Sequence, residues 1–286
     1  MAKIRDYNCL YSTYSGIDKE FVKALGLKMP DFYSRAAGLA KYSAAVKEKN
    51  DDAFCKLPFD TFLAGEALGV PMVYDESPVG LRKREDLITN PEEILKLDKI
   101  DPSKGRLAET INACDILREQ GEFVVFEIRG LFDTLNSLLD IQNVMLFWLT
   151  QQEKMQEVCD FLKENLMIEL NAAKDHCDMF FYSDASGGVN IIGPKMGKML
   201  VEWFTYPFLK DVAKTLNPGQ KMQMCPKTAF MLLGTETGEY AKADAEGTTY
   251  FEKYNRLPDN IQFLGEKCNR DLSDTCKGQV NYINLL

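Results

Sequence analysis

The chain has 286 residues, of which 45% are hydrophobic and 27% are charged, values that are ordinary for a globular protein with a full core. Its formal net charge is −9, and acidic and basic residues are interspersed, which argues against nucleic acid and anionic membranes as partners. The start of the chain has no apolar signal region, and no run approaches the roughly 18 apolar residues of a membrane span, so we expect a cytoplasmic protein.

The cysteines and the single histidine limit the kinds of site. Eight cysteines occur without a CxxC pair, and in a reducing compartment we expect small core residues rather than a disulfide framework. His176 is the one histidine, so histidine-rich metal sites are excluded. It lies between a helical pattern and a strand pattern, where a structural role is expected.

The first half of the chain alternates helical patterns with short apolar runs. After an irregular start, the expected elements are helices over about 17–26 and 31–48, a strand over 53–57, a short helix around 66–69, a strand over 71–74, a helix start at 90–93, a helix over 105–120 and a strand over 122–128. The run from Glu122 to Ile128 is the clearest buried strand.

The second half begins with more helix. The expected elements are helices over 131–139, 142–149 and 152–174, a strand over 178–182, helices over 195–204 and 206–215, a strand over 222–225, a helix over 228–233 and strands over 261–264 and 280–285. Helix 152–174 is amphipathic, with apolar residues spaced by three and four. Region 238–250 is ambiguous, although 242–244 fits a short strand end.

This alternation predicts the fold class. Eight strand candidates are separated mostly by helical segments, without a linker or an internal repeat. Short apolar strands that alternate with helices indicate parallel pairing through crossover helices. Eight such units in one chain of this length favour an α/β fold with a single (β/α)8 TIM barrel over residues 1–286, preceded by an N-terminal irregular segment and helices over 1–50.

A resemblance to a known family rests on the order of several short motifs. These are Leu57 to Asp60, Glu66 to Gly69, Glu127 to Phe132, Tyr182 to Asp184, Gly193-Pro194 and Tyr206 to Phe208. In this order and spacing, over roughly residues 30 to 270, the chain resembles the uroporphyrinogen decarboxylase superfamily. It is more similar to the cobamide-dependent methyltransferases of that superfamily than to the decarboxylases. The resemblance implies a TIM barrel, in agreement with the strand count.

The resemblance also implies a zinc site. In the methyltransferase branch, a His-x-Cys at a strand end and a later cysteine bind zinc, while a corrinoid (cobalamin) on a small partner protein carries the methyl group. Here Gln223-Met224-Cys225 replaces the His-x-Cys, and Cys268 is placed at the later cysteine by position alone. The third ligand could be Gln223 or a carboxylate. Glu266 or Glu127 is chemically preferable, because an amide oxygen is a poor zinc ligand.

Other candidate residues follow strands at the edge where α/β proteins build their sites. Asp60 and Asp184 are the candidate catalytic groups, able to bind substrate or move a proton; the alternative for each is a carboxylate that caps a turn. Arg129 is a candidate for binding an anion or the corrinoid, with an ion pair to Glu127 as its alternative. Tyr182 is a candidate for lining a corrin pocket, with strand core as its alternative.

We therefore expect a methyltransferase that exchanges a methyl group between a corrinoid and a small molecule, with zinc held by cysteine thiolates. The donor or acceptor is left open among methoxylated aromatics, methylamines, a folate and a small thiol. One alternative is a decarboxylase-like lyase, although residues 1–30 contain only Arg5 where such enzymes hold an arginine cluster. The other alternative is a non-catalytic barrel that binds a corrinoid or a partner.

Overall fold

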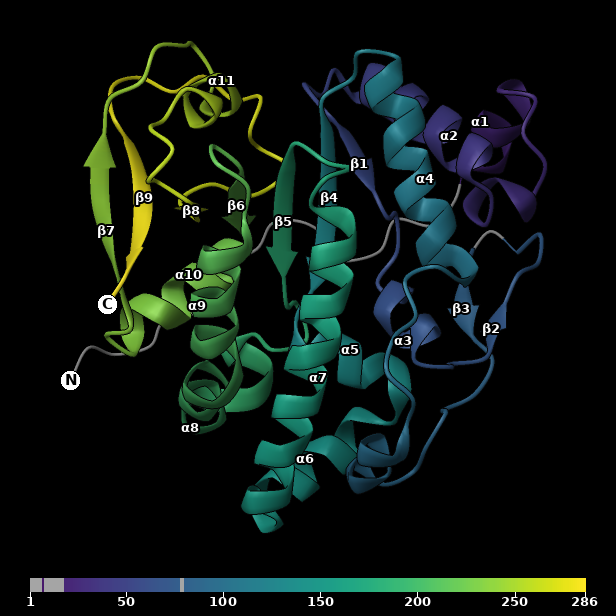
Figure 1. The fold of residues 1–286 in the computed structure, drawn as a ribbon, viewed down its shortest axis with the longest axis vertical. Coiled ribbons are helices and arrows are strands. Elements are labelled where there is room, and N and C mark those ends of the chain that lie inside the picture. Colours follow the sequence, from purple (N-terminus) through teal and green to yellow (C-terminus); the bar gives the residue numbers. More distant parts are fainter. Residues whose placement is uncertain (1–6, 8–17, 78–79) are drawn as a thin grey trace.

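A computed structural model describes residue 7 and residues 18–77 and 80–286. Its main feature is a seven-stranded sheet (Figure 1). In spatial order the strands are β1 (Cys55–Leu57), β4 (Val124–Arg129), β5 (Met179–Ser183), β6 (Lys221–Met224), β8 (Phe263–Leu264), β9 (Val280–Leu285) and β7 (Gly238–Ala243). The protein is therefore α/β with a mostly parallel sheet, as the alternating pattern predicts.

The number and the direction of the strands differ from the expectation. Strands β1, β4, β5, β6 and β8 are parallel, but β9 is antiparallel to β8 and β7 is antiparallel to β9. The run expected as a strand over 71–74 leaves the main sheet and forms a small antiparallel pair, β2 (Met72–Val73) with β3 (Arg82–Lys83). The expectation of eight parallel strands is therefore wrong. A closed barrel is not confirmed, because within the described residues no pairing joins β1 to β7 at the two ends of the sheet.

Helices connect and cover the strands. The α-helices are α1 (Lys19–Ala24), α2 (Ala36–Asn50), α3 (Leu63–Ala67), α4 (Gly105–Glu119), α5 (Leu131–Leu138), α6 (Ile141–Thr150), α7 (Gln152–Ala173), α8 (Val189–Leu200), α9 (Tyr206–Thr215), α10 (Pro226–Gly234) and α11 (Tyr250–Asn255). Shorter turns are η1 (Asp31–Tyr33), η2 (Pro91–Lys96) and the π-helical η3 (Val201–Thr205). The periodic pattern of 152–174 is confirmed as α7, whereas the helix expected over 31–48 is divided into η1 and α2.

The two faces of the sheet have different roles because successive side chains of a strand point to opposite sides. On one face Phe126, Phe180 and Met222 belong to the large apolar core that includes the helices. On the other face Val125 and Phe181 belong to a smaller cluster. By the same alternation, Lys56, Glu127, Arg129 and Gln223 lie on this second face. These four side chains are therefore directed away from the helical layer.

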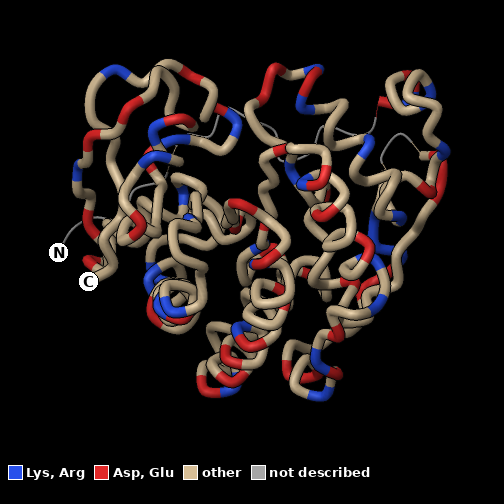
Figure 2. The backbone as a smooth tube through the Cα atoms, turned by 45° about the horizontal axis from the view of Figure 1, so that its top comes forward, with Lys and Arg blue, Asp and Glu red and all other residues tan. Residues whose placement is uncertain are grey.

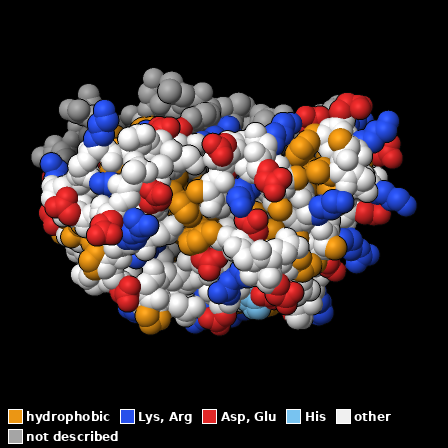
Figure 3. Space-filling view, turned by 90° about the horizontal axis from the view of Figure 1, so that it is seen from above, with side chains coloured by type: hydrophobic (Ala, Val, Ile, Leu, Met, Phe, Trp, Pro, Cys, Tyr) orange, Lys and Arg blue, Asp and Glu red, His pale blue; other side chains and the backbone are white. Residues whose placement is uncertain are grey.

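Charge and apolar surface are distributed evenly. Lys and Arg alternate with Asp and Glu along the described chain (Figure 2), and the face seen from above shows charges of both signs around small apolar groups (Figure 3). No helix within the described ranges combines the length and the apolar character needed to cross a bilayer. Among the described cysteines, Cys55, Cys114, Cys159, Cys177 and Cys276 are buried, and Cys225 and Cys268 are partly exposed.

Candidate active site

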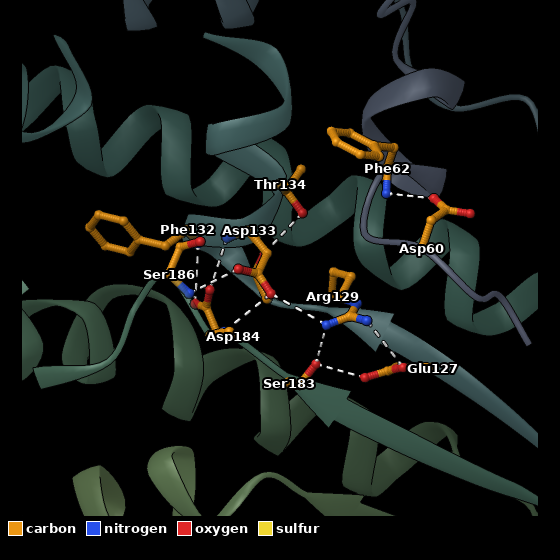
Figure 4. A network of polar contacts seen from close by, with 12 residues as sticks. Asp60, Phe62, Glu127, Arg129, Phe132, Asp133, Thr134, Ser183, Asp184 and Ser186 are labelled. Carbon is orange, nitrogen blue, oxygen red and sulfur yellow. Dashed lines mark hydrogen bonds and ion pairs between the residues drawn. The ribbon is translucent and has the colours of Figure 1, made fainter. Parts of the chain in front are cut away.

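Two basic side chains from neighbouring strands share one buried carboxylate. Lys56 Nζ of β1 lies 2.8 Å from Glu127 Oε2 of β4, and Arg129 Nη2 lies 3.2 Å from the same oxygen. Ser183 of β5 donates to Glu127 Oε1 at 2.8 Å and accepts from Arg129 Nη1 at 2.8 Å (Figure 4). Parallel register brings these groups together, since Arg129 pairs with Ser183 across the sheet. Arg129 Nη1 also lies 3.7 Å from Asp133 Oδ2, so the centre contains two cations and two carboxylates.

The ionisation of this centre follows from its charges. Burial opposes ionisation of Glu127, but Arg129 and Lys56 outweigh it and lower the pKa of Glu127 to about 2. Burial likewise opposes the charge of Arg129, while Glu127, Asp133, Asp60 and Cys225 raise its pKa. Asp60 and Cys225, two residues that the sequence proposes for the site, therefore lie within electrostatic range of Arg129. Glu127 and Arg129 are therefore both charged at neutral pH.

Asp184 is buried and holds a loop junction together. Its oxygens accept from the backbone amides of Phe132 at 3.2 Å and Asp133 at 2.9 Å, in the first turn of α5. Asp133 in turn accepts from the amides of Ala185 at 3.1 Å and Ser186 at 2.9 Å (Figure 4). Burial and the adjacent Asp133 charge raise the pKa of Asp184. The structure thus places Asp184 beside the centre, where it fixes the backbone that follows Arg129.

Gly130 allows this junction to close. A Cβ at this position would lie 2.5 Å from Asp184 Cβ and 2.6 Å from the Tyr182 hydroxyl. Real Cβ atoms essentially never approach other heavy atoms below 3.0 Å. The backbone just after β4 can lie against the Asp184 and Tyr182 side chains only because residue 130 has no side chain.

Asp60 is tied to a second buried arginine. Arg106 Nη1 lies 2.5 Å from Asp60 Oδ2 and Nη2 lies 3.1 Å from Oδ1, a bidentate pair. The Nε of Arg106 binds Glu66 Oε2 at 2.6 Å, and Glu66 also accepts from the Tyr74 hydroxyl. The Arg106 side chain is only 2% exposed. Asp60 therefore borders the site with its charge already neutralised by Arg106. This does not favour the decarboxylase-like alternative, in which Asp60 would stabilise a positively charged intermediate.

A cavity of about 580 Å³ adjoins the centre. Its walls come from α2, from β1 and the turn after it, from Arg129 and Phe181, and from the loop after β8. Lys56, Asp60 and Arg129 all line it. Cavities of about 300–1,000 Å³ are typical of sites for small molecules. The two cations and Asp60 thus face a space large enough for a substrate.

The four proposed zinc ligands do not form a compact ligand set. Glu266 accepts from both the backbone amide and the side-chain amide of Asn281, at 2.7 Å each. Gln223 is fully buried and donates to the carbonyls of Met224 and Lys267, while its Oε1 has no hydrogen-bond partner among the described residues. Within the described residues, no group of three or more His, Cys, Asp and Glu side chains is placed to hold a metal ion. As arranged, these residues do not fit a zinc site.

The remaining candidates lie in different surroundings. Cys225 and Cys268 are both partly exposed, and the amide of Cys225 donates to the carbonyl of Tyr182 at 2.8 Å. The Tyr182 ring is fully buried on the helical face and packs against Phe208 with ring centroids 5.6 Å apart. The strand-core alternative describes the position of Tyr182, because this ring does not line the cavity.

Three polar residues of this region were absent from the sequence-based set. Lys56 is the middle residue of a short strand, and the alternation Cys55-Lys56-Leu57 marks one polar position between two buried ones. That alternation could have shown that Lys56 faces away from the core. Arg106 and Asp133 carry no comparable local signal, since their partners come from distant parts of the chain.

Comparisons with known proteins give a likeness in fold. No protein-family model matches the chain, and no curated protein matches it. Among solved structures, a methyltransferase from Methanosarcina mazei superposes with a TM-score of 0.60 and 17% sequence identity. The match covers 78% of this chain and 66% of that chain. At this identity the likeness shows that the two chains share an α/β fold.

Proposed function

We propose that the protein is a methyltransferase that moves a methyl group between a corrinoid on a small partner protein and a small molecule bound in the cavity. The observation that carries this proposal is the cavity lined by Lys56, Asp60 and Arg129, in a fold shared with a solved methyltransferase. The order of sequence motifs shared with cobamide-dependent methyltransferases supports it independently.

The residues of the centre have defined tasks in this proposal. Lys56 and Arg129 hold the small molecule, because both line the cavity and both are anchored by Glu127. Ser183 and the Asp133–Asp184 junction fix the Arg129 guanidinium, so that little ordering is needed when the substrate binds. A corrinoid on the partner would supply the group that carries the methyl. That the carrier is a corrinoid, and that the donor or acceptor is a small molecule, are both part of this proposal.

Zinc has no step in this mechanism. The described residues do not assemble the expected ligand set around Cys225 and Cys268, so no chemistry is derived through a metal. The zinc site implied by the family resemblance stays a prediction. Metal analysis of freshly prepared, unchelated protein tests it: about one zinc per chain that is lost in a Cys225→Ser, Cys268→Ser double variant would establish the site.

Methyl transfer is tested with cobalamin as the carrier. The purified chain is mixed with cob(I)alamin and, in separate reactions, a methoxybenzoate, a methylamine, a methylated folate and a methyl thioether. Formation of methylcobalamin is followed by its visible absorption spectrum. The reverse reaction uses methylcobalamin with the corresponding demethylated acceptors. We expect turnover with at least one compound, and loss of at least tenfold in rate in Arg129→Met.

Two controls make this test specific. Arg82→Met removes an arginine from an exposed ion pair with Asp75, and Arg82 does not line the cavity, so this variant should keep the wild-type rate. A reaction that is equally fast without protein would be non-enzymatic. Absence of transfer in both directions with every compound, by protein that is folded, would overturn the proposal.

A further inference from the structure

The cavity is walled by aromatic rings as well as by charges. Phe54 and Phe181 meet edge to face with ring centroids 5.2 Å apart, and Tyr42 and Phe59 meet edge to face at 4.9 Å. All four residues line the cavity. Aromatic walls of this kind bind flat apolar molecules through offset and edge-to-face contacts. They also bind quaternary ammonium groups through cation–π contacts, so the charges of the cavity must decide between the two.

The basic groups Lys56 and Arg129 line the cavity, whereas the carboxylates that anchor them do not. Lys56 and Arg129 share Glu127, whose side chain is 5% exposed and does not line the cavity, whereas the Lys56 side chain is 37% exposed. The cations therefore face the cavity, and their common anion lies behind the wall. Arg270, from the loop after β8, lines the same space. Arg129 also pairs with Asp133 at 3.7 Å, and this carboxylate is buried and does not line the cavity either.

The other charged groups at the cavity do not reverse this sign. Asp60 is held bidentately by Arg106, and Lys47 is paired with Glu122. Asp52 accepts a hydrogen bond from the Asn50 side chain at 3.3 Å. An ammonium ligand would therefore meet Lys56 and Arg129 at this wall, where the lining carboxylates Asp52 and Asp60 already have partners.

We propose that the cavity binds a flat, apolar carboxylate, with its ring between the aromatic walls and its carboxylate on Lys56 and Arg129. That this ligand is the methyl-transfer substrate rests on the proposed function. The binding itself rests on the shared Glu127 and on the two ring pairs. A guanidinium and an ammonium that converge on one carboxylate form charge-assisted hydrogen bonds that a neutral ligand cannot make.

Binding of benzoate to the full chain tests this inference. Isothermal titration calorimetry compares benzoate with benzamide, its neutral isostere, with acetate, which lacks the ring, and with benzyltrimethylammonium, which reverses the charge. We expect benzoate to bind at least tenfold more tightly than each of the other three. Equal binding of benzoate and benzamide, tighter binding of the ammonium compound, or no binding of benzoate would overturn the inference.

Two variants locate the ligand. Lys56→Met removes the more exposed cation and leaves the Arg129–Glu127 pair in place, and we expect about tenfold weaker binding of benzoate with little change for benzamide. Tyr42→Leu removes one ring and should weaken both compounds. Lys99→Met, which removes a lysine from an exposed pair with Glu164 outside the cavity, is the matched control and should bind benzoate as wild type does. Unchanged benzoate affinity in Lys56→Met would contradict the assigned position.

The outcomes separate this inference from the proposed function. If benzoate binds as expected but no methyl transfer is found with any compound, the ligand class stands and the methyltransferase proposal fails. If methyl transfer proceeds with a neutral or cationic compound and benzoate neither binds nor competes, the methyltransferase proposal stands and the ligand class is wrong.

Discussion

Asp133 and Asp184 each accept hydrogen bonds from the backbone next to the other, so that two loops are held by one pair of side chains. Each carboxylate satisfies amides that would otherwise be buried without an acceptor. Because Gly130 and Arg129 immediately precede the first of these loops, the pair also fixes the position of the guanidinium. The contacts of the junction are structural, and through them the junction positions Arg129 in the candidate site.

Replacing Asp184 by Ala should destabilise the protein by about 2–4 kcal/mol, because two buried amides lose their acceptors. Urea unfolding measures this cost. Asp140→Ala is the matched control, since Asp140 caps α6 through one exposed amide hydrogen bond and its loss should cost about 1 kcal/mol. Equal costs for the two variants would show that the junction adds nothing beyond an ordinary helix cap.

Gly130→Ala should be strongly destabilising, by about 3 kcal/mol or more, because the added methyl group overlaps Asp184 and Tyr182. Thermal unfolding or the yield of folded protein gives the readout. Gly197 in α8 provides the opposite case: a Cβ there would meet Val189 at 3.5 Å and Met231 at 3.7 Å, which are ordinary contacts. Gly197→Ala should therefore be neutral or stabilising by about 0.5–1 kcal/mol.

Arg106→Lys should cost about 3–5 kcal/mol even though the charge is kept. A lysine has no planar fork to bind Asp60 on two atoms and Glu66 on a third, so buried carboxylate oxygens lose their partners. The control is Arg82→Lys, since Arg82 forms a similar bidentate pair with Asp75 at the surface and should change stability by less than about 1 kcal/mol. A small effect at both sites would mean that lysine can replace the buried fork.

Glu169 on α7 should make stability fall as pH rises. Burial raises its pKa from 4.5 to about 8, with Arg106 opposing and Asp60 reinforcing the shift. Between these values the folded state keeps a proton that the unfolded state has lost, so stability decreases by about 1 kcal/mol per pH unit and levels off above pH 8. Glu169→Gln should reduce this slope in urea titrations from pH 5 to pH 8, and the remainder comes from Asp184, whose pKa is also raised by burial. Glu164→Gln, an exposed change on the same helix, should keep it.

Local patterns in the sequence were sufficient for the elements of the parallel part of the sheet. The apolar run that ends at Ile128 and the periodicity of 152–174 predicted β4 and α7 to within two residues. The antiparallel direction of β9 was not predictable in this way, because it depends on pairing with β7, and the sequence between 238 and 250 has no clear period. Strand direction is a property of long-range contacts, which no local window contains.

The sequence indicated where the candidate residues lie along the strands, but it did not show which residues they contact. Asp60, Asp184 and Arg129 follow strands, and the structure places all three around one centre. Their partners could not be inferred, since Arg106 is 46 residues from Asp60 and 40 residues from Glu66 in the sequence. Nothing in the helical pattern of 105–120 distinguishes a buried arginine from a surface one. Which carboxylates are neutralised, and which cations face the cavity, therefore required the fold.

The position of β9 between β8 and β7 sets an order of folding. Strand β7 comes earlier in the chain than β9, yet its one partner in the described sheet is β9. Residues 238–243 must therefore wait for residues 280–285, and the connection between them has to close before β7 gains its sheet hydrogen bonds. Contacts of this kind form late, because the entropy of loop closure is lost before pairing compensates for it. The parallel strands β1, β4, β5 and β6 can assemble first, with β7 added last as the outer strand.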